Sequence, residues 1–202
     1  MPLWLAAEPL VLASRSRARQ MLLAAAGIPF EARPADIDER DLEAAAPAPA
    51  PGAIAAFLAR QKAAAVARLC PGRLTLGADQ TLSLGTERFA KPADRTAARA
   101  QLRALCGRTH ELHSAIAFVK DGSVLFEHVG IARLTMRSFS AAFLDLYLDA
   151  AGDAATASVG AYQLEGLGAQ LFERVDGDYF TILGLPLIAA LDFLRRQGAL
   201  AQ

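Results

Sequence analysis

The chain has 202 residues, enough for one well-cored domain, and 53% of them are hydrophobic. Its 21 basic and 21 acidic residues cancel, which excludes the basic excess of a protein that wraps a nucleic-acid backbone. No apolar run is long enough to span a bilayer, and residues 1–9 make a poor signal peptide. Cys70 and Cys106 form no ligand pair. We therefore expect a cytoplasmic protein with reduced thiols and no membrane partner.

The first predicted strand, residues 10–13, leads directly into a polar turn and a helix that stops at Gly27. The turn carries Ser14 and Ser16, and Arg19 lies one helical turn further on. Free backbone N–H groups and the positive end of the helix dipole favour an anion there. The segment therefore predicts a phosphate site, and the alternative is a serine N-cap followed by solvated arginines.

Strand and helix patterns then alternate. Residues 28–33 are expected to form a second strand, and 46–51, where Ala and Pro alternate, an extended loop. Helical spacing returns at 53–69, and 74–78 predict a central strand. A helix capped by Asp94 or Thr96 should then reach Leu105 and end at Gly107.

The second half has a different character. Residues 111–119 and 124–136 predict a long hairpin around an Asp-Gly turn, and Ser140 should cap a helix over 143–148. Residues 169–175 and 179–183 suggest a second hairpin, followed by a terminal helix that starts at 184–186 and ends at Gly198. Interleaved helices and strands with two hairpins imply an α/β or α+β protein with a mixed sheet.

A few charged residues could carry chemistry. Asp79 follows the predicted central strand, and a carboxylate at a strand end can hold a metal or a water; a turn-capping aspartate is the alternative. Glu39 is a candidate second carboxylate, although its acidic segment 36–41 by itself favours a solvated loop. Two of the chain's three lysines, Lys62 and Lys91, flank Asp79 in sequence. Lys62 could equally be an ordinary solvent-facing lysine.

Several other enzyme classes are excluded by the sequence. His110 and His113 are three apart on a predicted strand, so they point to opposite faces and cannot chelate one metal. The chain has no GxSxG or HExxH motif, no GxxxxGK[ST] motif, and no GxGxxG after the first strand. A P-loop nucleotide site and a dinucleotide cofactor are therefore not expected.

The order of short motifs from Leu10 to the last helix closely resembles that of the Maf family. The motifs are Ala13-Ser14-x-Ser16-x-x-Arg19, Asp38-Glu39, Lys62-Ala63, Gly77-Ala78-Asp79, Lys91-Pro92, Leu105-Cys106-Gly107-Arg108-Thr109-His110, Gly160-Ala161-Tyr162, Glu165-Gly166-Leu167-Gly168 and Gly184-Leu185-Pro186-Leu187. The resemblance implies a fold similar to the inosine-triphosphate pyrophosphatases. In that fold, helices flank an elongated mixed β-sheet, with two lobes around a central cleft. The whole chain, 1–202, would then form a single domain in which 1–9 are a short N-terminal extension.

The same resemblance implies an enzyme: a nucleoside triphosphate pyrophosphatase that cleaves normal or modified nucleotides to the monophosphate and pyrophosphate, for housecleaning of the nucleotide pool. Its cofactor would be a divalent cation, Mg²⁺ or Mn²⁺, and a homodimer is suggested. Carried over by position, Asp79 would accept the proton of the attacking water and Glu39 would help hold the metal with it. The remaining carried-over residues would bind and neutralise the triphosphate; they are Ser14, Ser16, Arg19, Lys62 and Lys91.

Three departures bear on substrate choice. Ala18 stands where the dTTP- and UTP-hydrolysing branch has an arginine, whereas Gln80 and Glu165 resemble the branch that acts on 7-methyl-GTP. A carboxylate at Glu165 could accept hydrogen bonds from the N1–H and the N2 amino group of a guanine, a pair of donors that a pyrimidine lacks. Gly160-Ala161-Tyr162 instead resembles the dTTP/UTP branch. The alternatives are a 7-methyl-GTP-preferring enzyme, a cell-division regulator that acts by binding, or a nucleotide-binding module without turnover.

Overall fold

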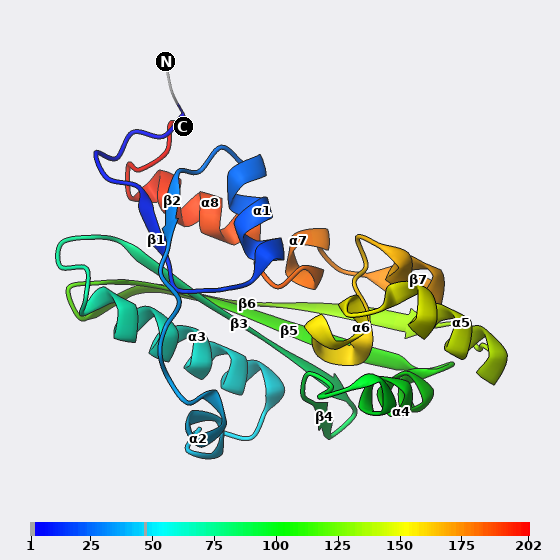
Figure 1. The fold of residues 1–202 in the computed structure, drawn as a ribbon. Coiled ribbons are helices and arrows are strands. Elements are labelled where there is room, and N and C mark those ends of the chain that lie inside the picture. Colours follow the sequence, from blue (N-terminus) through cyan, green and yellow to red (C-terminus); the bar gives the residue numbers. More distant parts are fainter. Residues whose placement is uncertain (1–2, 47) are drawn as a thin grey trace. The chain divides into compact units, whose positions relative to one another are not determined.

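The structure, a computed structural model, describes residues 3–46 and 48–202. Met1 and Pro2 of the predicted N-terminal extension, and Pro47 of the predicted Ala-Pro loop, lie outside the described residues. The strands are β1 (Leu10–Leu12), β2 (Phe30–Ala32), β3 (Thr75–Leu84), β4 (Glu87–Phe89), β5 (Thr109–Lys120), β6 (Ser123–Met136) and β7 (Phe172–Asp176). The helices are α1 (Arg17–Ala25), α2 (Glu39–Ala44), α3 (Pro51–Ala67), α4 (Arg95–Leu105), α5 (Ala141–Ala151), α6 (Ala154–Ala157), α7 (Tyr179–Ile182) and α8 (Leu187–Arg196), and Figure 1 shows them along the chain.

The strands form one mixed sheet, as predicted, in the order β2-β1-β3-β5-β6-β7, with β4 paired to β3. β1 runs parallel to both β2 and β3, whereas β4 and β7 run antiparallel to β3 and β6, respectively. The long β5–β6 hairpin is confirmed. Its turn residues Asp121 and Gly122 both have positive φ, 48° and 78°, as a type I′ turn requires.

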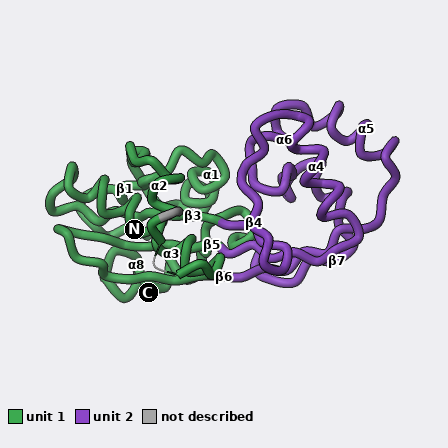
Figure 2. Tube along the Cα trace, turned by 90° about the horizontal axis from the view of Figure 1, so that it is seen from below, with its two compact units in different colours: residues 1–80, 114–130, 179–202 green, residues 81–113, 131–178 purple. Residues whose placement is uncertain are grey.

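The chain divides into two compact units, coloured separately in Figure 2. Unit 1 comprises residues 1–80, 114–130 and 179–202, and unit 2 comprises 81–113 and 131–178. Strands β3, β5 and β6 therefore contribute residues to both units. Among the helices in the described part of the chain, none is long and apolar enough to span a bilayer.

Small residues set the packing of α3 in unit 1. A buried cluster joins one face of α3 to β5, and it consists of Ala55, Ala59, Ala63, Ala67, Ala115, Ala117 and Val119. A Cβ added at Gly77 of β3 would overlap the carbonyl oxygen of Ala59 and lie 2.7 Å from the amide nitrogen of Ala63. The backbone of α3 therefore lies directly against β3, which only side chains as small as these permit.

Most predicted helices are confirmed, with their caps. Ser16, Asp94 and Ser140 each accept a hydrogen bond from the backbone N–H three residues on, at 3.4, 2.7 and 3.1 Å. Helix α3 begins at Pro51, two residues earlier than expected, because proline suits the first helical position. Helix α8 ends before Gly198, whose φ is +68°.

Three sequence-based predictions are wrong. The acidic segment 36–41 is a loop only as far as Asp38 and helical beyond it, because Asp38 caps helix α2 by accepting from the backbone nitrogens of Arg40 and Asp41. Asp79 does not follow a strand but lies in the middle of β3. The second hairpin does not form: β7 pairs with β6 instead, and 179–182 are helical. The non-local edge of β6 thus outcompeted the local turn signal of Asp176-Gly177.

Candidate functional site

One lysine side chain in unit 1 bridges two carboxylates. The Nζ atom of Lys62, on α3, lies 2.6 Å from Oδ1 of Asp79 on β3 and 2.8 Å from Oε2 of Glu39, the first residue of α2. The side chains of Lys62 and Asp79 are only 10% and 9% exposed, whereas that of Glu39 is 56% exposed. The solvent-facing alternative for Lys62 is therefore wrong.

The close contact between α3 and β3 explains why the lysine is buried. Lys62 directly precedes Ala63, an alanine of α3 that packs against Gly77 of β3. Asp79 is two residues beyond Gly77 on the same strand. Residues two apart on a strand point to the same face. Asp79 therefore points toward α3, and the pair is formed by the packing that removes it from water.

Burial and nearby charges act on Asp79 in opposite directions. Burial raises the pKa of the Asp79 carboxyl above its ordinary value, and the positive charges of Lys62 and Arg19 lower it in part. The negative charge of Glu39 adds a smaller upward contribution. The result is a carboxylate that is more basic than usual, yet has an ammonium partner that favours its charged form. Such a group accepts a proton more readily than an ordinary aspartate does.

Arg19 is half-buried and ties three segments together. Its Nη1 atom donates to the carbonyl oxygen of Ala78 at 2.7 Å and to Oγ of Ser14 at 3.1 Å, and its Nε atom donates to the carbonyl oxygen of Gly184 at 2.8 Å. Burial lowers the pKa of Arg19, and the charges of Asp79 and Glu39 oppose that shift. Arg19 is therefore not a solvated arginine, although the N-cap at Ser16 is confirmed.

The two serines of this turn retain hydroxyl protons for a ligand. Oγ of Ser14 accepts from the backbone nitrogen of Ser16 at 3.2 Å and from Arg19 at 3.1 Å. Oγ of Ser16 accepts from the backbone nitrogen of Arg19 at 3.4 Å. In each contact the serine oxygen is the acceptor, so both O–H groups can donate to an anion at the start of α1.

The side chain of Gln80 is held by residues that the sequence analysis did not identify. Its Nε2 atom donates to Oγ of Ser114 at 2.8 Å and to the carbonyl oxygens of Thr181 and Ile182 at 3.2 and 3.0 Å. Ser114 in turn donates to the carbonyl oxygen of Thr181 at 2.7 Å. One signal was available: Ser114 is a polar residue that directly precedes the apolar run 115–119 of the predicted strand. Its partners lie far away in sequence and could not be inferred from spacing.

Three other predicted site residues are not among the side chains that meet at Lys62. Ala18 is partly buried in the first turn of α1, in unit 1. Lys91 and Glu165 are exposed residues of unit 2, whereas the cluster around Lys62 is built by unit 1 alone. Tyr162, also in unit 2, is buried, and its hydroxyl lies 2.7 Å from Nε2 of His110. That contact indicates a packing role for Tyr162 within its unit.

The donor set of the cluster fits a magnesium-type ion. No group of three or more His, Cys, Asp or Glu side chains forms a metal cage within the described ranges 3–46 and 48–202. Asp79 and Glu39 nevertheless converge on one cationic atom, the Nζ of Lys62. Mg²⁺ is commonly held by one or two carboxylates together with substrate phosphates and water. The two carboxylates therefore suit an ion that arrives with a phosphorylated ligand.

Comparisons with known proteins cover the whole chain. A family model described as Maf-like protein matches residues 9–197. A nucleoside triphosphate pyrophosphatase of Rhodopseudomonas palustris (strain ATCC BAA-98 / CGA009) is 63% identical over 201 residues, and one of Bradyrhizobium diazoefficiens is 58% identical over 201 residues; each match covers 100% of both chains. A 7-methyl-GTP pyrophosphatase of Mesorhizobium japonicum is 53% identical over 195 residues, which are 96% of this chain and 98% of the relative.

Proposed function

The chain belongs to the Maf family and is a nucleoside triphosphate pyrophosphatase, and we propose that the cluster of Lys62, Asp79 and Glu39 is its catalytic centre. The observation that supports this assignment is the buried Lys62–Asp79 pair, whose Nζ and Oδ1 atoms are 2.6 Å apart. A buried ion pair is a poor source of stability, because desolvation offsets most of the attraction. Its placement beside an exposed third charge, Glu39, fits a role in chemistry better than a role in folding.

In the proposed reaction Asp79 is the general base. A water molecule gives one proton to the Asp79 carboxylate as its oxygen forms a bond to phosphorus. The anhydride linkage between the α- and β-phosphates breaks, and the electron pair of that bond leaves with the departing phosphate oxygen. The products are a nucleoside monophosphate and pyrophosphate. The raised pKa of Asp79 makes it a better proton acceptor than an ordinary aspartate.

The cationic and hydroxyl groups of unit 1 would bind the triphosphate. Ser14 and Ser16 donate their O–H groups to phosphate oxygens, and the N-terminus of α1 and the charge of Arg19 favour the anion. Lys62 neutralises charge that develops during bond cleavage. We also assign Lys91, a residue of unit 2, to the binding of the phosphates. We also infer that residues 1–202 act as a single functional domain.

A divalent cation, Mg²⁺ or Mn²⁺, would be held by Asp79 and Glu39. When bound, such an ion supplies positive charge to the phosphate oxygens and lowers the barrier to cleavage. Glu39 is exposed at the cluster, so it can turn toward a metal–nucleotide complex. Lys62 contacts one oxygen of each carboxylate and therefore orients both groups for the ion.

For the nucleotide base that the enzyme prefers, specific observations support one alternative, 7-methyl-GTP. Gln80 and Glu165 match the 7-methyl-GTP branch, and the Mesorhizobium japonicum relative carries that name. With its Nε2 hydrogens engaged by Ser114, Thr181 and Ile182, Gln80 can offer only its Oε1 atom, an acceptor, to a base. An acceptor there can pair with a ring N–H, which guanine, uracil and thymine all carry, so the support for the guanine branch comes from Glu165 and from the name of the Mesorhizobium japonicum relative. Ala18, a small residue, removes one contact that a strict dTTP/UTP enzyme would use.

The test is a pyrophosphate-release assay over common and modified nucleoside triphosphates, including dTTP, UTP, GTP and 7-methyl-GTP, with and without Mg²⁺ or Mn²⁺. We expect monophosphate and pyrophosphate in equal amounts, and none after chelation of the metal. Release of orthophosphate in place of pyrophosphate would contradict the reaction. A clear preference for dTTP and UTP over 7-methyl-GTP would contradict the roles given to Ala18, Gln80 and Glu165. Sedimentation of the purified chain tests the homodimer.

A further inference from the structure

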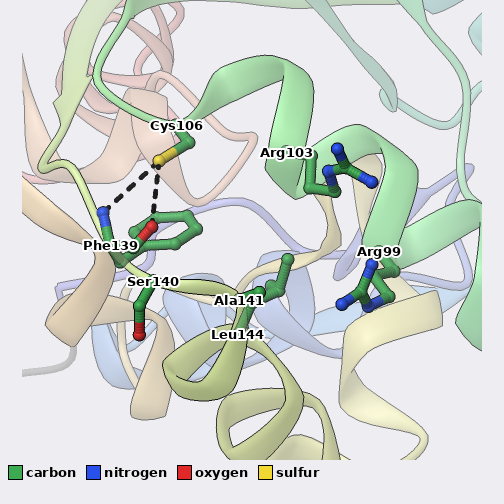
Figure 3. Close-up of a pocket in the computed structure, with 7 residues that line it drawn as sticks. All are labelled: Arg99, Arg103, Cys106, Phe139, Ser140, Ala141 and Leu144. Atoms are coloured by element: carbon green, nitrogen blue, oxygen red, sulfur yellow. Dashed lines mark hydrogen bonds between the residues drawn. The ribbon is translucent and has the colours of Figure 1, made fainter.

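Unit 2 contains a cavity of about 380 Å³ that the proposed reaction does not use. Its lining residues, drawn in Figure 3, are Arg99, Arg103, Cys106, Phe139, Ser140, Ala141 and Leu144. They come from α4, from the start of α5 and from the segments next to these two helices. None of the residues that we assign to catalysis or to the triphosphate is among them.

Arginines of α4 pair with aspartates of α5 in a regular ladder next to this cavity. Arg95 pairs with Asp149 through Nη2 and Oδ1 at 2.8 Å, and Arg99 pairs with Asp145 through Nε and Oδ1 at 2.7 Å. Nη2 of Arg99 also donates to the other oxygen of Asp145, at 3.2 Å. The ladder advances by four residues along α4 and goes back by four along α5. Each rung is therefore one helical turn from the last, as for two antiparallel helices.

The next rung of the ladder lacks its acid. Four residues beyond Arg99 is Arg103, and four residues before Asp145 is Ala141. Both residues line the cavity. Arg103 is exposed and has no ion-pair partner among the residues that the structure describes, whereas Arg99 is neutralised by Asp145. The cavity thus lies where the ladder would place a carboxylate opposite Arg103, but where Ala141 supplies only a methyl group.

The walls of the cavity complement an anion with an apolar body. No acidic residue lies in the first turn of α5, and the side chain of Ser140 is already engaged with the backbone nitrogen of Phe143 at 3.1 Å. The sulfur of Cys106 accepts from the backbone nitrogen of Phe139 at 3.4 Å, which holds the segment before α5 in place. Phe139 and Leu144 provide apolar wall.

We propose that this cavity is a binding site for a small organic phosphate, whose phosphate group pairs with Arg103 in place of the missing acid and whose organic part packs against Phe139 and Leu144. The inference is independent of the proposed function, because it concerns residues that take no part in the reaction. A phosphate suits the planar guanidinium of arginine, which can donate two parallel hydrogen bonds to it.

The test follows the full-length chain by ¹H–¹⁵N NMR while phenyl phosphate is added, with inorganic phosphate as a second probe. The backbone amide signals of Ala141 and Ala142 report this cavity, and those of Ser14 and Ser16 report unit 1. We expect a saturable shift at Ala141, with phenyl phosphate binding about tenfold tighter than inorganic phosphate because of its apolar ring. Equal affinities would overturn the role of the apolar wall. The absence of a saturable shift would overturn the site.

Two pairs of variants sharpen the test. Arg103→Gln should weaken binding about tenfold, while Arg195→Gln, which removes another exposed positive charge, on α8, should leave it unchanged. Ala141→Asp supplies the missing acid of the ladder and should abolish the shift. Ala142→Asp places the same charge one residue along the same helix terminus but off the ladder, and should bind nearly as the wild type does. Equal effects of Ala141→Asp and Ala142→Asp would overturn the ladder argument.

Discussion

The ammonium of Lys62 lies 2.6 Å from the carboxylate of Asp79, and both side chains are almost completely buried. The contact joins the middle of a long helix to the middle of a central strand, and it exists because the alanines of α3 and Gly77 of β3 allow the two backbones to touch. This arrangement therefore bears both on the reaction and on the stability of unit 1.

Asp79→Asn should abolish pyrophosphate release while leaving the fold intact. The amide has nearly the shape of the carboxylate but cannot accept the proton of water, and a general base contributes about 10²–10⁴-fold to the rate. Glu39 remains as a partner for Lys62. The measurement is the rate of pyrophosphate release, with circular dichroism as the check on folding. Asp192→Asn, at an exposed surface ion pair on α8, is the matched control, and turnover that survives Asp79→Asn would remove Asp79 from the mechanism.

The pH dependence of the residual activity should move in opposite directions in two variants. Lys62 lowers the pKa of Asp79, so Lys62→Met should shift the acid limb of the rate profile to higher pH. Glu39 raises the pKa of Asp79, so Glu39→Gln should shift that limb to lower pH. Both variants will be slower than the wild type, and the informative quantity is the midpoint of the limb. Shifts of the same sign in the two variants would contradict the electrostatic assignment.

The same pKa shift makes a prediction about stability. Because the folded-state pKa of Asp79 is raised above its ordinary value of 3.8, the folded chain binds more protons than the unfolded chain in the window above 3.8. The contribution of Asp79 to stability is therefore fully present below that value and is lost as pH rises through the folded-state pKa. Lys62→Met extends the window upward, so its free energy of unfolding should fall more steeply with pH than that of the wild type, as measured by urea titration at several pH values.

Arg19→Lys should destabilise the chain although it keeps the positive charge. A lysine cannot reproduce the fork with which Nε and Nη1 reach the carbonyl oxygens of Gly184 and Ala78. Leaving buried acceptors without partners costs about 1–3 kcal/mol each, so the free energy of unfolding should fall by about 3 kcal/mol in urea titration. Arg17→Lys, at an exposed position of the same helix, should change it little. Equal stability of the two variants would show that only the charge of Arg19 matters.

Gly77→Ala should loosen the contact between α3 and β3. The added methyl group would overlap the carbonyl oxygen of Ala59, which belongs to a rigid helix backbone and cannot move aside cheaply. Overpacking of this kind costs about 3 kcal/mol, and because it displaces Lys62 from Asp79, pyrophosphate release should fall as well. At Gly166 a Cβ would lie no closer than 3.8 Å to its neighbour, the carbonyl oxygen of Gln163. Gly166→Ala should therefore be tolerated in both assays.

His110 should weaken the fold in acid. Burial lowers the pKa of His110 from 6.5 to about 4. Between these two pH values, the unfolded chain is protonated at His110 and the folded chain is not. The stability present above pH 6.5 is lost as pH falls toward 4, by about 3 kcal/mol for the full shift. His110→Gln should therefore flatten the acid limb of a plot of unfolding free energy against pH, whereas His128→Gln, at an exposed position of β6, should leave it unchanged.

Local features of the chain could be predicted because short-range interactions decide them. The caps at Asp94 and Ser140 and the Asp121-Gly122 turn involve residues at most three apart, so the sequence contains both partners of each interaction. Where a local signal had a non-local competitor, the prediction failed. Residues 172–176 pair with β6 instead of forming a local hairpin. The polar residues from Asp79 onward continue strand β3, because unit 1 supplies hydrogen-bond partners for Asp79 and Gln80.

By itself, the sequence determined the helices α1, α3, α4, α5 and α8, the caps at Ser16, Asp94 and Ser140, the long β5–β6 hairpin, the family resemblance and the residue types available for catalysis. Only the tertiary structure decided which charges meet and which are buried. Lys62, Asp79 and Glu39 come from three separate elements, and Arg103 lacks an acid only because α4 and α5 pack in one particular register. Burial and Coulomb interaction depend on distances across the fold, and the packing of small residues at Gly77 and along α3 sets those distances in unit 1.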